Sequence, residues 1–80
     1  MKARITVTLK SGVLDPQGKA INNTLDDLGF EGINKVRQGK IFNIEIAETD
    51  KTKAEVQLKE MSEKLLANMV MENYEIELLD

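Results

Sequence analysis

The 80-residue chain contains no cysteine and no histidine. The first absence excludes a disulfide framework, a thiol nucleophile and a thiolate metal site. The second removes the commonest general base and the commonest transition-metal ligand. Ser11 and Ser62 therefore have no imidazole that could activate them as nucleophiles. These absences favour a binding or structural module over an enzyme.

Tryptophan is also absent, and a net charge of −3 argues against a nucleic-acid surface, which usually carries a basic stripe. No apolar run approaches the roughly 20 residues of a membrane span, and the N-terminus lacks the apolar core of a secretory signal. We therefore expect a cytoplasmic protein that binds neither nucleic acid nor membrane. Residues 1–80 make one small domain, and a chain of this size buries only about 60% of its unfolded surface, so self-association would add stability.

Hydrophobic periodicity predicts the order β-α-β-β-α-β. Residues 3–10 alternate between apolar and polar, as a strand with one buried face does, and residues 33–47 and 73–79 predict a hairpin and a last strand. Helices are predicted over residues 16–28 and over about 50–67, each with one apolar stripe. The expected fold is α+β and ferredoxin-like, with two helices on one face of a four-stranded antiparallel sheet of order 4-1-3-2.

Capping residues predict where the first helix begins and ends. Asp15 is a favoured N-cap, and Pro16 fits the first helical position. Gly29 fits the left-handed C′ position, with Phe30 and Leu25 as the pair that a Schellman motif joins.

The second helix has two candidate starts, at Thr49-Asp50 and at the capping box that begins at Thr52. Its stripe is predicted to be Ala54, Leu58, Met61 and Leu65, and Asn68 is predicted to be its left-handed cap.

The hairpin can be phased by apolar burial. A three-residue loop ending in a left-handed Gly39, as in a G1 bulge, buries more apolar surface than a two-residue loop. It places four apolar side chains on the core face: Val36, Phe42, Ile44 and Ile46. Ile33 and Ile41 then form a small apolar spot on the opposite face, which invites a partner.

Gly18 lies within the first turn of the first helix, where glycine costs about 1 kcal/mol relative to alanine. Either the helix start packs closely on a neighbouring element, or a partner or anion approaches the N-terminus of the helix. Lys10, Arg37 and Lys40 form a basic cluster near the hairpin tip, which suits partner contact or simple solubility.

Three segments together resemble the PurS family, the small subunit of phosphoribosylformylglycinamidine synthase. They are residues 13–18 (VLDPQG), residues 36–40 (VRQGK), and residues 63–68 (EKLLAN) followed by Val70, Glu72 and Tyr74. The likeness covers essentially the whole chain. Met71 departs from the family, which more usually has a β-branched residue there.

The resemblance implies a non-catalytic subunit that joins a glutaminase subunit to an ATP-using synthetase and helps the ammonia passage to form. The complex converts formylglycinamide ribonucleotide, glutamine and ATP to the amidine in purine biosynthesis. ATP and Mg²⁺ are expected on the synthetase, with no cofactor on this chain, which is expected to form a homodimer or a higher oligomer. The residues expected to contact partners are Leu14, Asp15, Pro16, Gln17, Gly18, Arg37, Gly39 and Lys40.

Two other classes of function remain open. One is a free-standing ferredoxin-like regulatory domain that binds a small effector at a subunit interface. The other is an RNA-binding sheet, which needs surface aromatics to stack bases. The predicted open face offers Thr6, Thr8, Asn43 and Glu45 instead.

Overall fold

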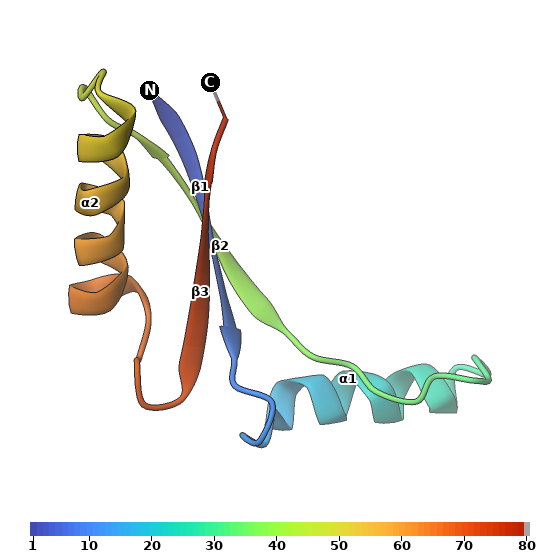
Figure 1. Ribbon diagram of the computed structural model, residues 1–80. Coiled ribbons are helices and arrows are strands. Elements are labelled where there is room, and N and C mark those ends of the chain that lie inside the picture. Colours follow the sequence, from blue (N-terminus) through green and yellow to red (C-terminus); the bar gives the residue numbers. More distant parts are fainter. Residues whose placement is uncertain (80) are drawn as a thin grey trace.

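The computed structural model describes residues 1–79 (Figure 1). Its elements, in chain order, are β1 (Lys2–Leu9), α1 (Pro16–Asp27), β2 (Gly39–Glu45), α2 (Lys51–Met61), the π-helical turn η1 (Ser62–Leu66) and β3 (Glu72–Leu78).

Within these residues the sheet has three antiparallel strands in the order β2-β1-β3. Ile5 at the centre of β1 lies opposite Phe42 on one side and Ile76 on the other. Ala3, Ile5 and Val7 of β1 are almost fully buried, and they form the core with Leu58 of α2. The core therefore lies between the sheet and α2, which runs alongside it (Figure 1).

The expectation of a fourth strand is wrong for residues 1–79, because residues 30–38 form no strand there. The backbone N–H of Gln38 donates to the Asp15 carboxylate (2.7 Å), and the Arg37 guanidinium donates to backbone carbonyls before α1. These bonds fasten the segment before β2 to the start of α1 instead of to the edge of β2. The predicted packing of two helices on one face of the sheet is likewise not formed by residues 1–79, because only α2 packs there (Figure 1).

The predicted bulge at Gly39 is also wrong. Gly39 does not have a positive φ; it is the first residue of β2 and lies opposite Thr8. A Cβ at this position would lie 2.8 Å from the carbonyl oxygen of Val7, so glycine is needed for close approach of the two strands. The predicted facing is confirmed for Phe42 and its two neighbours on the core side, Ile44 and Ile46.

Helix α1 projects away from the sheet instead of packing on it (Figure 1). The main packing contacts between elements of residues 1–79 join β1 to β2 and β3, and α2 to η1 and β3. The radius of gyration is 16.0 Å, against about 12 Å for a compact chain of this length. We call α1 and residues 28–38 the arm. One chain thus combines a small packed sheet with an extended arm.

The predicted ends of α1 are confirmed. The Asp15 side chain caps the N-terminus by accepting from the Gly18 N–H, and Gly29 has a φ of +94°. The N–H of Phe30 donates to the Leu25 carbonyl (3.1 Å) and that of Gly29 to the Asp26 carbonyl (3.0 Å), which is the bond pattern of a Schellman motif.

Helix α2 starts at the first of the two candidate sites, with the Asp50 side chain accepting from the Lys53 N–H. Its end differs from the prediction, because η1 inserts a wider turn that changes which side chains face inward. Ser62 is fully buried and its hydroxyl donates to the Leu58 carbonyl, whereas Leu65 is 82% exposed. Asn68 does not adopt the predicted left-handed conformation.

Candidate functional site

Most of the predicted contact residues gather where the sheet meets the arm. Residues 10–18 lead from β1 into α1, residues 36–39 return from the arm into β2, and hydrogen bonds join the two segments. We call these two segments the elbow. Lys40 follows the elbow but has its own partner, described below. The role of these residues in contacting partners stays a prediction.

Asp15 is the centre of the elbow and is only 6% exposed. One carboxylate oxygen accepts from the N–H of Gly18 (2.8 Å) and the other from the N–H of Gln38 (2.7 Å). The bond from Gln38, the bond from Gly18 and the nearby Arg37 charge hold the pKa of Asp15 below its ordinary value. Both oxygens are thus engaged within the chain, and the carboxylate remains ionised at neutral pH.

The Arg37 guanidinium ties the same two segments together from the other side. It donates to the carbonyl of Val13 (2.7 Å) and to the carbonyl of Lys10 (2.9 Å). The planar guanidinium holds two donors in a fixed geometry, so one side chain can fix the turn before α1.

Gly18 has an internal reason to be glycine. A Cβ at this position would collide with the backbone carbonyl oxygen of Val36 and press on the Asp15 carboxylate. Close packing of the helix start on a neighbouring segment therefore accounts for this residue. Contact between Gly18 and a partner stays a prediction.

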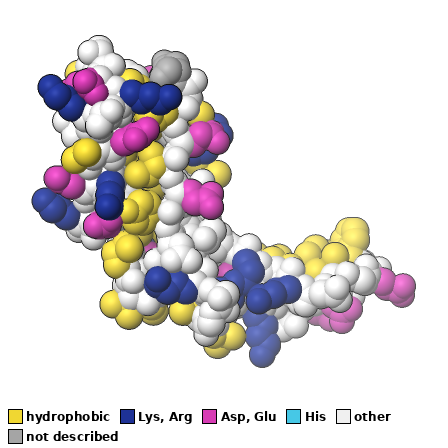
Figure 2. All heavy atoms as spheres, in the orientation of Figure 1, with side chains coloured by type: hydrophobic (Ala, Val, Ile, Leu, Met, Phe, Trp, Pro, Cys, Tyr) yellow, Lys and Arg dark blue, Asp and Glu magenta, His cyan; other side chains and the backbone are white. Residues whose placement is uncertain are grey.

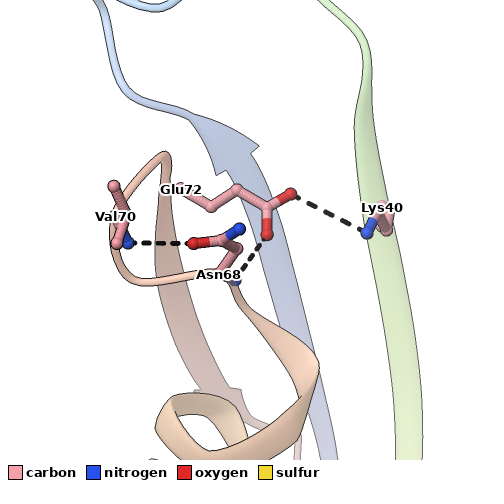
Figure 3. Close-up of polar contacts among 4 residues, drawn as sticks. All are labelled: Lys40, Asn68, Val70 and Glu72. Carbon is pink, nitrogen blue, oxygen red and sulfur yellow. Dashed lines mark hydrogen bonds and ion pairs between the residues drawn. The ribbon is translucent and has the colours of Figure 1, made fainter.

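Lys40 of β2 follows the elbow directly and forms an ion pair with Glu72 of β3 (3.7 Å; Figure 3). The other oxygen of the Glu72 carboxylate accepts from the Asn68 N–H (2.6 Å), and the Asn68 side chain accepts from the Val70 N–H (3.0 Å). Glu72 therefore fixes the turn before β3 as well as pairing with Lys40. Its position at the first residue of β3, directly after this turn, was a signal that the sequence argument did not use.

The predicted basic cluster is divided among separate partners. Lys10 donates to the Asn73 side chain (3.2 Å), Arg37 to backbone carbonyls, and Lys40 pairs with Glu72. Beside Lys40 lies an open hollow of ≈ 280 Å³, and Val7, Leu9 and Asp15 are among the residues that line it. Of the residues that the structure describes, no group of three or more acidic side chains is placed to hold a metal ion. Because their charged groups are paired within the chain, the residues of the elbow suit a role in shaping the surface.

The arm presents an apolar surface. The part that belongs to α1 was expected to pack on the sheet, whereas Ile33 was expected on the open face. Figure 2 shows hydrophobic side chains exposed toward the far end of the arm. The large apolar side chains exposed on the arm are Ile21, Leu28, Phe30 and Ile33. A second exposed apolar group lies around the turn before β3: Leu65, Met69, Val70 and Met71. Apolar side chains gathered in this way are typical of surfaces that contact other proteins.

No helix in residues 1–79 has the length and apolar character needed to cross a membrane.

The comparisons with known proteins agree on one family. The family described as PurS, phosphoribosylformylglycinamidine (FGAM) synthase, matches residues 2–80. A relative from Synechocystis, phosphoribosylformylglycinamidine synthase subunit PurS, is 45% identical over 71 residues, which cover 89% of this chain and 71% of the relative.

Two solved structures extend the likeness to three dimensions. The C2 crystal form of PurS from B. subtilis matches with a TM-score of 0.90 and 40% identity, covering 99% of this chain and 98% of that chain. A chain in the structure of PurLQS from Thermotoga maritima matches with a TM-score of 0.88 and 37% identity, covering 98% and 95%. This chain therefore belongs to the PurS family, the PurS subunit of phosphoribosylformylglycinamidine synthase in purine biosynthesis.

Proposed function

We propose that this chain is a non-catalytic assembly subunit that joins a glutaminase subunit to an ATP-dependent synthetase subunit and assists the transfer of ammonia between them. The observation that carries the proposal is the arm, whose large apolar side chains are exposed and whose helix α1 takes no part in the main packing between elements of residues 1–79. The similarity to a chain of PurLQS from Thermotoga maritima over 98% of this chain supports it. ATP and Mg²⁺ belong to the synthetase in this scheme, no cofactor is held by this chain, and the complex is cytoplasmic.

We further propose that two copies of this chain associate. An 80-residue chain with an extended arm leaves a large share of its apolar surface in water, and association of two copies would cover it. The ferredoxin-like arrangement expected from the sequence would then be completed between copies instead of within one. The eight predicted contact residues would serve by shaping the junction from which the arm projects.

The test combines the purified chain with separately purified glutaminase and synthetase subunits. We expect glutamine-dependent formation of the amidine product to require this chain, and the chain alone to hydrolyse neither glutamine nor ATP. Leu28→Asp, on the arm, should abolish the stimulation because it places a charge in an apolar contact. Val56→Asp is the matched control, because Val56 is an exposed apolar residue on α2 instead of on the arm.

Full activity without this chain would contradict the proposal, as would equal loss of activity in the two aspartate variants. Glutamine hydrolysis that disappears on mutation of a residue of this chain would contradict the non-catalytic role.

A further inference from the structure

The direction of the arm depends on the elbow. Helix α1 has no part in the main packing of residues 1–79, so the sheet and α2 do not hold it. What joins the arm to the sheet is a pair of chain segments that cross next to each other, residues 10–18 and 36–39. A change in this junction would redirect the whole of α1.

Hydrogen bonds in both directions join the two segments of the elbow, and we call the bonds of Asp15 and Arg37 the bracket. Asp15 on the outgoing segment accepts from Gln38 on the returning one, and Arg37 on the returning segment donates to Lys10 and Val13 on the outgoing one. The backbones approach so closely at Gly18 that no Cβ fits. The bonds and the close approach together hold the two segments in one relative orientation.

The Asp15 carboxylate has no free oxygen with which to recognise a partner. Asp15 is almost fully buried, and each of its oxygens already accepts a backbone N–H. The Arg37 guanidinium donates hydrogen bonds to two backbone carbonyls of its own chain. Direct recognition of a partner by the Asp15 carboxylate would require breaking bonds that hold the elbow. Arg37 keeps further N–H donors, so a contact role for it is separated from a positioning role by the distance measurement below.

We propose that Asp15 and Arg37 are positioning residues, which hold the arm in its extended direction before assembly and affect subunit association through that direction. This inference rests on the proposed role of the arm in assembly. An arm that is fixed in advance does not lose conformational freedom on binding, and the gain appears as affinity. If the bracket opens and the arm spends only about a tenth of its time in the competent direction, the apparent dissociation constant rises about tenfold.

The direction of the arm can be measured directly because the chain has no native cysteine. Spin labels at Asp27→Cys on α1 and Lys59→Cys on α2 report the distance between the arm and α2. The labelled chain is diluted into an excess of unlabelled chain, so that distances between copies do not contribute. We expect a single narrow distance distribution for the parent chain and a broad one for Asp15→Ala and Arg37→Ala.

Association is measured on the same variants by sedimentation. We expect the dissociation constant between copies to rise about tenfold in Asp15→Ala and Arg37→Ala. Lys35→Ala is the matched control, because it removes an exposed cation two residues before Arg37 and should leave both measurements unchanged. If an alanine variant fails to fold, Asp15→Asn and Arg37→Lys take its place, since each keeps part of the bonding and should broaden the distribution less.

Weakened association with an unchanged narrow distribution would overturn the proposal, because the two residues would then act by contact. A broad distribution with unchanged association would overturn it as well. The distance measurement does not depend on the proposed function: a parent chain that never associates would refute self-association, while the distributions would still report whether the bracket fixes the arm.

Discussion

At the scale of single residues, contacts within the chain determine which residues fit in the elbow. Asp15 acts both as the N-cap of α1 and as the anchor for the chain that returns from the arm. Gly18 is required by the carbonyl of Val36, which no local rule for helix starts would reveal. The sequence indicated that Gly18 needed a bare backbone, and the structure supplies the neighbour.

The first residue-level prediction concerns Gly18→Ala. The added Cβ must displace the Val36 carbonyl, so we expect the free energy of unfolding to fall by about 1–3 kcal/mol in urea denaturation. Gly12→Ala is the control, because nothing lies within 4 Å of the site of its Cβ, and it should change stability by no more than about 0.5 kcal/mol. Equal effects of the two substitutions would show that the close approach at Gly18 is not maintained in solution.

The second residue-level prediction concerns pH. Because the pKa of Asp15 is lower in the folded chain than its ordinary value of 3.8, its ionised form stabilises the fold fully above that value. This contribution is lost as the pH falls through the lower, folded pKa. Urea denaturation should therefore show a stability difference between the parent chain and Asp15→Asn at about pH 6 that shrinks at about pH 3. A difference that stays constant between these pH values would mean that the carboxylate charge does not stabilise the elbow.

At the scale of elements, the sequence predicted what local chemistry determines. The start of α1 at Asp15 and Pro16 and its end at Gly29 follow from capping preferences that act within one turn. The inward faces of β1, β2 and β3 follow from alternation, because a strand with one buried side has a period of two.

The errors arise where contacts distant in sequence decide the outcome. Residues 30–38 have apolar side chains that suit a strand, but the Gln38 N–H donates to Asp15 and the Arg37 side chain donates to the Val13 carbonyl before α1. The stripe of α2 was projected to Leu65 with a regular helical period. Ser62, four residues after Leu58, continues the buried stripe, whereas Leu65 lies within the π-helical turn η1 and is exposed. The residues predicted to contact partners lie mostly in two segments that hydrogen bonds join, and those bonds could not be predicted because the two segments are distant in sequence.

At the scale of the whole molecule, the shape of the chain argues for its association. Its dimensions are 49 × 26 × 15 Å, and the long dimension reflects the arm, whose apolar side chains face solvent in the single chain. Folding and association should then be linked, because a partner copy that binds the folded chain stabilises it by mass action.

We expect the thermal midpoint of the isolated chain to rise with protein concentration. Phe30→Asp, at the far end of the arm, should remove that dependence while the far-ultraviolet circular dichroism of the sheet and helices is retained. A midpoint that is independent of concentration for the parent chain would contradict association of two copies. The apolar side chains of the arm would then be buried by a different subunit of the synthase.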